Sequence, residues 1–180
     1  ILLTISACQK ETKSVVIIPD EIIPNDLRLN EIQVLGSHNS YRTSPDADIL
    51  EVLETLQGAL PNSFNVKELD YTHLPLKTQF EKHGIRQIEL DLYQDPNGGL
   101  FFNRKGYQFV GKSTKSNEIR LTKPGIKVMH IPDIDFNTHY LTFLESLQAV
   151  KDFSKEFPNH VPITIMLEMK TETLADYVPN

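Results

Sequence analysis

Acidic, amide and imidazole side chains stand where the predicted strands of this sequence end. Glu89 and Asp91 are two residues apart in a strand-like segment, so both side chains should project from one face of a sheet. Glu168 should project in the same way, because it alternates with the apolar residues of the last predicted strand. The polar residues at the four strand ends are His38, Asn39, Glu89, Asp91, His130 and Glu168. Such a set on successive strands indicates a catalytic site at one end of a sheet.

These side chains have the chemistry of a metal-dependent site. Three carboxylates on one face would repel one another unless a cation neutralised them. Oxygen ligands from the carboxylates and from the amide of Asn39 suit calcium or magnesium, whereas zinc favours nitrogen and sulfur ligands. His38 and His130 would then lie beside the metal as general acid and general base. Taken one at a time, each residue is also typical of a helix cap or a solvated strand end, so the hypothesis depends on the whole set.

Hydrophobic periodicity predicts the elements that position these residues. Alternating patterns predict strands at residues 31–36, 85–92, 126–131 and 163–169. Apolar residues three and four positions apart predict helices at residues 46–60, 76–83 and 138–157. Residues 95–99 predict a turn, and residues 100–123 a polar, lysine-rich excursion with a hairpin near residues 100–102. Strands that alternate with helices predict a parallel sheet with its site at the carboxyl ends of the strands.

The order of these elements predicts an α/β fold of the (β/α)8 TIM-barrel type. Four units of strand and helix make about half of such a barrel, which takes about 250 residues, whereas this sequence has 180. We therefore expect residues 29–180 to hold the N-terminal part of a barrel, with residues 1–28 ahead of it.

Four short segments carry the candidate site residues in a distinctive order. Residues 36–41 are Gly-Ser-His-Asn-Ser-Tyr, and Leu-Pro-Leu at 74–76 leads to Gly-Ile-Arg-Gln-Ile-Glu-Leu-Asp at 84–91. Residues 127–135 are Lys-Val-Met-His-Ile-Pro-Asp-Ile-Asp, and residues 162–170 end in Leu-Glu-Met-Lys. From about residue 29 to residue 170 the chain thus resembles the calcium-dependent phosphatidylinositol-specific phospholipases C, most closely their bacterial branch.

The resemblance implies a fold, a cofactor and an activity. The family is similar in fold to a distorted barrel, the PLC-like phosphodiesterase fold, and cleaves phosphatidylinositol-type lipids to diacylglycerol and a cyclic or hydrolysed inositol phosphate. Lys170, on the same strand face as Glu168, would either contact the substrate phosphate or be a solvated strand-end lysine. The implied roles are His38 and His130 as the catalytic pair, with Asn39, Glu89, Asp91 and Glu168 as ligands of Ca2+.

Two other functions fit parts of the pattern. Glycerophosphodiester phosphodiesterases are also barrels with paired histidines and a carboxylate-bound metal, but their His-Arg-Gly opening differs from His-Asn-Ser at residues 38–40. A catalytically inactive barrel that acts as a surface binding lipoprotein is the second alternative. Retention of all six site residues argues against it.

Charge and the N-terminal residues indicate the surroundings of the protein. A net charge of -6 argues against a nucleic-acid partner, because phosphate-backbone binding needs clustered cationic residues.

The N-terminal residues Ile5-Ser6-Ala7-Cys8 resemble the lipobox of bacterial lipoproteins. We therefore expect residues 1–28 to be a signal-peptide remnant, a lipidation site at Cys8 and a tether. We therefore expect an exported bacterial lipoprotein, anchored to a membrane in the periplasm or at the cell surface, or otherwise a secreted protein. The alternative interpretation of these residues is an apolar N-terminus with a buried or idle thiol. No protein partner is inferred, and no apolar run approaches the roughly 18 residues of a membrane span.

Overall fold

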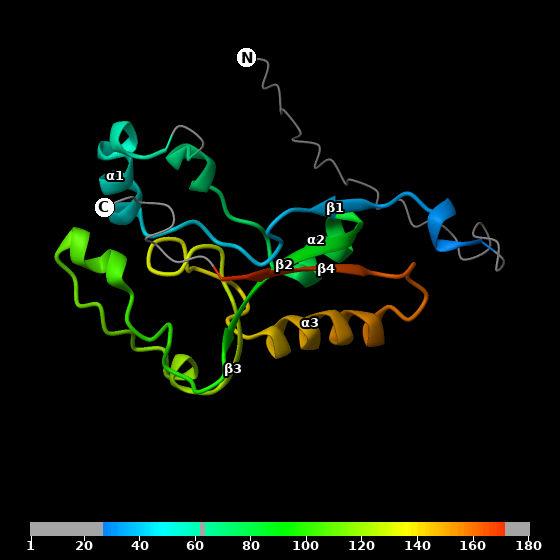
Figure 1. Cartoon of the computed structure of the whole chain (residues 1–180). Helices are drawn as coiled ribbons and strands as arrows, with labels where there is room; N and C mark the ends of the chain where they lie inside the picture. The colour runs from blue at the N-terminus through cyan, green and yellow to red at the C-terminus, as the bar shows by residue number, and fades with distance from the viewer. Residues whose placement is uncertain (1–26, 62–63, 172–180) are drawn as a thin grey trace, which may run out of the picture. The chain divides into compact units, whose positions relative to one another are not determined.

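A computed structural model describes residues 27–61 and 64–171 of the chain (Figure 1). Cys8, with the predicted lipobox and most of the predicted tether, lies outside these residues. The chain divides into two compact units, residues 1–33 and residues 34–180. The described part of the first unit holds one short 3-10 helix, η2 (Leu29–Glu31). None of the helices in the described ranges has the length and apolar character that crossing a membrane requires.

The second unit is built on a four-stranded sheet whose centre is the long strand β2 (Ile85–Asp95). Strand β1 (Leu35–Ser37) lies parallel to the first half of β2, and β4 (Thr164–Lys170) lies parallel to most of it. Strand β3 (Gly125–Val128) runs antiparallel to the last residues of β2. Ile88 pairs with both β1 and β4, and Leu92 pairs with both β3 and β4. Strands β1 and β3 therefore lie on the same side of β2, opposite β4, with β1 beside the start of β2 and β3 beside its end.

The antiparallel direction of β3 corrects the sequence-based prediction of an entirely parallel sheet. Residues 96–124, which join β2 to β3, contain no α-helix, so the chain does not cross back to the start of the sheet. It leaves the sheet at Asp95 and returns beside it at Gly125, which is the geometry of an antiparallel pair. The first predicted strand was also placed too early, because β1 begins only at Leu35.

Three α-helices accompany the sheet, at positions close to the predicted ones. Helix α1 (Ala47–Thr55) is shorter than predicted, whereas α2 (Leu76–His83) has the predicted bounds. Gly84 ends α2 in the left-handed conformation, with φ 65°, which glycine adopts without steric cost. Helix α3 (Phe143–Glu156) starts five residues later than predicted, at a capping box formed by Thr142 and Glu145.

The main core lies on one face of β2 and leaves the other face for polar residues. Ile88, Leu90 and Leu92 are buried in one apolar cluster with Leu76 and Phe80 of α2. Burial of each such side chain contributes about 1.5–3 kcal/mol, so the alternation in β2 fixes which face meets the helices. Glu89 and Asp91 must then project from the opposite face.

The connection between β2 and β3 is an irregular segment rather than the predicted hairpin. It contains two 3-10 helices, η5 (Lys105–Val110) and η6 (Ile119–Thr122). The main-chain N–H of Lys105 donates to Asp133 Oδ1 over 2.8 Å. A β-carbon at Gly106 would lie 2.1 Å from the carbonyl oxygen of Asp133, so only glycine permits this approach. The segment is thereby held against the turn that follows His130.

Candidate metal centre

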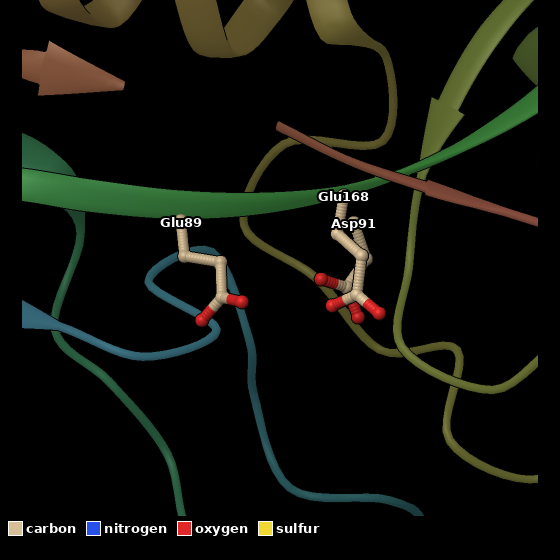
Figure 2. Close-up of side chains that lie close together, drawn as sticks. All are labelled: Glu89, Asp91 and Glu168. Atoms are coloured by element: carbon tan, nitrogen blue, oxygen red, sulfur yellow. The ribbon is translucent and has the colours of Figure 1, made fainter. Parts of the chain in front are cut away.

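Three carboxylates converge on the polar face of β2. Asp91 and Glu168 are register partners on the adjacent strands β2 and β4, and Glu89 lies two residues before Asp91. One oxygen atom from each of the three lies within 4.8 Å of the others. Figure 2 shows the three side chains projecting from the same side of the two strands. Glu89 and Asp91 are buried, whereas the side chain of Glu168 is half exposed, so the group is open on one side.

The electrostatics of this group favour a bound cation. Burial raises the pKa of Asp91 above its ordinary value, and the negative charge of Glu168 adds to the rise, while Lys170 acts in the opposite direction. Burial also raises the pKa of the Tyr41 hydroxyl, and neighbouring Asp91 contributes to that shift. Both shifts arise where negative charge is concentrated and poorly solvated, which is the condition that a divalent cation relieves.

Asn39 approaches the carboxylates from the loop after β1. Its main-chain N–H donates to Glu89 Oε2 over 3.1 Å, and its φ of 49° lies in the left-handed region that asparagine tolerates better than most residues. One terminal atom of its amide lies 3.3 Å from both oxygens of Asp91. An amide NH2 at that position would donate to Asp91, whereas an amide oxygen would need a cation between it and the carboxylate. The Asn39 amide can therefore donate to Asp91 when the site is empty, and its oxygen can face a cation when the site is filled.

A network of hydrogen bonds from Gln79 and Ser40 holds this loop in place. The Gln79 amide nitrogen donates to the Ser40 carbonyl over 2.7 Å, and its oxygen accepts from the Ser37 hydroxyl over 2.8 Å. The main-chain N–H of Glu89 donates to Ser40 Oγ over 3.0 Å, which ties the loop to β2. Sequence reasoning did not assign Gln79 to the site. Its signal was a polar residue placed with Leu76 and Phe80 on the helix face that is buried.

His38 lies at the open side of the group. Its side chain is 76% exposed, and its Nε2 lies 3.5 Å from Glu89 Oε2. The His38 carbonyl accepts a hydrogen bond from the His73 ring over 2.7 Å, and the His73 carbonyl accepts one from the His139 ring over 2.7 Å. His73 and His139, which the sequence left outside the site, thus support the loop that carries His38.

His130 is oriented by a buried carboxylate that sequence reasoning missed. Its Nδ1 lies 2.6 Å from Asp135 Oδ2, and the same oxygen accepts from Arg42 Nε over 2.8 Å. Arg42 and Asp135 are completely buried, and Arg42 also donates to the carbonyls of Leu69 and Tyr71. Because Asp135 Oδ2 accepts from Arg42 and lies against Nδ1 of His130, Nδ1 is the ring nitrogen that donates to it and Nε2 is left for other partners.

The turn after β3 places this pair. Ile131 and Asp135 exchange two main-chain hydrogen bonds of 3.0 and 2.9 Å across the tight turn between them. Since Val128 pairs with Leu92, the antiparallel course of the chain leads His130 back towards Asp91. The charge of His130 influences the pKa of Asp91, consistent with that approach.

Lys170 lies inside the acidic group. Its Nζ is 3.2 Å from Asp91 Oδ2 and 3.3 Å from Glu168 Oε1. The ammonium group therefore neutralises part of the charge that the three carboxylates concentrate. Among the described residues, the side chains of His38, Asn39, Glu89, Asp91, Glu168 and Lys170 lie together, and the charge of His130 acts on Asp91.

Comparison with known proteins gives one match. A family model described as "Phosphoinositide phospholipase C, Ca2+-dependent" matches residues 27–179. The match covers most of the chain and all residues of the candidate metal centre, and it is the family that the sequence motifs predicted. No curated protein and no solved structure matches the chain.

Proposed function

Because this chain belongs to the calcium-dependent phosphoinositide phospholipase C family, whose cofactor is Ca2+, we propose that it cleaves the phosphodiester bond of a phosphatidylinositol-type lipid. The products are diacylglycerol and a cyclic or hydrolysed inositol phosphate. The observation that carries the proposal is the convergence of Glu89, Asp91 and Glu168 beside two histidines.

The residues present fit Ca2+. Three carboxylates and the Asn39 amide give an oxygen-only set of donors, and Ca2+ accepts about six to eight oxygens. The remaining positions suit water and the oxygens of a phosphodiester. When bound, Ca2+ supplies charge neutralisation for the phosphoryl group and acidifies a nearby hydroxyl.

Glu89 and His38 perform the proton transfers in this proposal, and His130 binds the phosphoryl group. As the inositol 2-hydroxyl oxygen forms its bond to phosphorus, the bond from phosphorus to the diacylglycerol oxygen breaks. Glu89 takes the hydroxyl proton, and His38, at the exposed side of the site, gives a proton to the departing diacylglycerol oxygen. His130, held through Nδ1 by Asp135, donates in its imidazolium form from Nε2–H to a phosphoryl oxygen.

An assay of the full-length protein tests the function. Vesicles that contain phosphatidylinositol should release diacylglycerol in the presence of calcium and not in the presence of a chelator. Soluble glycerophosphodiesters are the comparison substrates, because the alternative phosphodiesterase activity would prefer them. Faster cleavage of glycerophosphodiesters than of phosphatidylinositol would contradict the proposal.

The contacts of Lys170 lead to a prediction about calcium affinity. Its ammonium must leave Asp91 and Glu168 when Ca2+ binds, so Lys170→Gln should bind calcium on the order of tenfold more tightly, because it removes a partly buried competing charge. The variant should also unfold at a lower temperature in chelator, because the acidic group then lacks its counter-ion. Calorimetric titration and thermal unfolding measure the two effects.

Lys151→Gln is the matched control, since Lys151 is exposed on α3. It should change neither quantity. Unchanged calcium affinity in Lys170→Gln would show that the ammonium does not compete with the metal. A lysine released in this way would be available to the substrate phosphate.

We also propose that the sheet belongs to a (β/α)8 barrel. Three parallel strands occur in the order β1, β2, β4, as neighbouring barrel strands do. Among the described residues, β4 pairs only with β2, and its Met166, Leu167 and Met169 are about half exposed. An apolar edge of this kind suits a further strand.

The lipobox resemblance supports a membrane anchor at Cys8, which we propose as the means by which the enzyme stays near its lipid substrate. Cys8→Ser in the full-length protein should move it from the membrane fraction to the soluble fraction. Fractionation followed by immunoblotting measures the change, with metabolic lipid labelling of the parent protein as the control. Unchanged fractionation, or a parent protein without label, would remove the anchor.

A further inference from the structure

A polar pocket lies outside the candidate metal centre, in the irregular segment between β2 and β3. It has a volume of about 450 Å³ and is lined by residues 104–120 of that segment and by residues 136–141. Four of its lining side chains are cationic and one is acidic, Glu118. The cationic ones are Arg104, Lys112, Lys115 and Arg120. The pocket is therefore a candidate for an anionic ligand.

Arg104 is the feature that points to a missing partner. The residue is only 6% exposed, and its guanidinium lies 4.0 Å above the ring of Phe136. Its Nη1 is buried without a hydrogen-bond partner among the described residues. Burial lowers the pKa of Arg104 to about 10, which still leaves the group charged at neutral pH. A buried, unpaired guanidinium is costly unless an acceptor completes it.

The acids near the pocket are already committed to other cations. Glu118 accepts from Arg120 Nε over 2.8 Å, and Arg120 also pairs with Glu145. Lys112 pairs with Asp48 over 2.6 Å. These pairs leave the charges of Arg104 and exposed Lys115 without an ion pair among the described residues. An anion that entered the pocket would meet two available positive charges.

Hydroxyl groups provide further donors. Ser113 Oγ accepts from the main-chain N–H of Lys115 over 3.3 Å, and Ser116 Oγ accepts from that of Glu118 over 3.0 Å. Because both oxygens act as acceptors towards the backbone, their O–H groups remain available to donate to a ligand. Two cationic side chains with hydroxyl donors are the arrangement that proteins use for phosphate oxygens.

We propose that this pocket binds a phosphate group through Arg104 and Lys115. The ligand class is a phosphomonoester, either free in solution or on the head group of a lipid beside the substrate. The pocket lies next to the proposed catalytic residues, because Phe136 follows Asp135 in the chain. A lipid phosphate held there would keep the enzyme at an anionic membrane surface.

Binding of phosphate to the full-length protein in chelator tests the proposal without involving the calcium site. Glycerol 3-phosphate is the soluble probe, measured by calorimetry and by its effect on the temperature of unfolding. The wild-type protein should bind it and be stabilised, because a ligand that binds only the folded state raises its stability. Arg104→Met should weaken binding about tenfold or more, since a charged hydrogen-bond donor is lost.

Arg104→Met should not lower the temperature of unfolding when phosphate is absent, because the unpaired charge is removed while contact with Phe136 is kept. Lys115→Gln is the second variant, at an exposed position where the fold is not at risk, and should weaken binding roughly threefold to tenfold. Lys105→Gln is the control, since Lys105 is exposed on the same segment but does not line the pocket. It should bind like the wild type.

Vesicles that contain phosphatidic acid distinguish the two sources of the phosphate. Loss of vesicle binding in Lys115→Gln would identify a lipid head group, whereas binding of the soluble probe alone would identify a free phosphomonoester. Absence of phosphate binding by the wild type, or equal binding by both pocket variants and the wild type, would overturn the proposal. Calcium affinity and phosphatidylinositol cleavage, measured on the same proteins, report on the proposed function separately.

Discussion

His130→Ala is expected to lower the turnover number at least about a hundredfold, the lower range for loss of a hydrogen bond to transition-state charge. The buried Asp135 holds Nδ1 of His130 at 2.6 Å, so the imidazole has one defined orientation and its Nε2 is the nitrogen presented to the phosphoryl group. Removal of the imidazole deprives the transition state of a positioned hydrogen-bond donor. Steady-state kinetics on phosphatidylinositol vesicles measure the loss, and calcium affinity should change little, because an oxygen-binding metal does not use this imidazole.

Asp135→Asn separates the orientation of His130 from its chemistry. The asparagine amide can donate to Nδ1 and so reverse the tautomer, which should lower kcat while KM stays nearly constant. Because Arg42 would lose its buried counter-ion, thermal unfolding of the variant must be measured alongside. Wild-type turnover in His130→Ala would show that this histidine is not the second catalytic one.

Asp91→Asn is expected to weaken calcium binding by roughly one to two orders of magnitude, since the number of charged ligands tunes the Kd of calcium sites over several orders. Asp91 is fully buried, and its carboxylate lies 3.3 Å from the Asn39 amide and 3.2 Å from Lys170 Nζ, so no water can easily replace its charge. Calorimetric titration with calcium measures the effect. Added calcium should restore part of the lost turnover.

The same variant should be more stable than the wild type in chelator. A carboxyl group whose folded-state pKa is raised binds its proton more tightly in the folded state than in the unfolded one. Its contribution to wild-type stability is present below the unfolded-state pKa of about 3.9 and is lost as the pH rises through the raised value. Asp91→Asn should flatten this pH dependence, whereas Glu51→Gln, a charge removed from the exposed face of α1, should leave it intact. An unchanged calcium affinity in Asp91→Asn would exclude this residue as a ligand.

Local patterns in the sequence predicted the elements whose ends or faces depend only on residues nearby in the chain. Helix α2 ends at Gly84 as expected, because glycine adopts the left-handed conformation that closes a helix. The alternation within β2 placed Glu89 and Asp91 on one face, and the structure confirms that shared face. A period of two depends only on the pleat of one strand, so it could be read without knowing the strand's neighbours.

The direction of β3 could not be obtained in this way. A strand shows the same alternation whether its neighbour is parallel or antiparallel, and only the path of residues 96–124 decides between the two. We predicted His130 as a site residue because we expected its strand to be parallel to the others and to end at the same edge of the sheet. In the structure His130 approaches Asp91 because β3 runs the other way.

The sequence by itself determined which residue types could bind calcium and transfer protons, and, through its motifs, the family to which the chain belongs. The tertiary structure alone decided which buried groups support them. Asp135 is 93 residues from Arg42, and Gln79 is 39 residues from Ser40, so neither pairing has a periodic signal in the chain. Such pairings arise when packing removes water from a polar group, which then requires a partner from whatever segment the fold brings beside it.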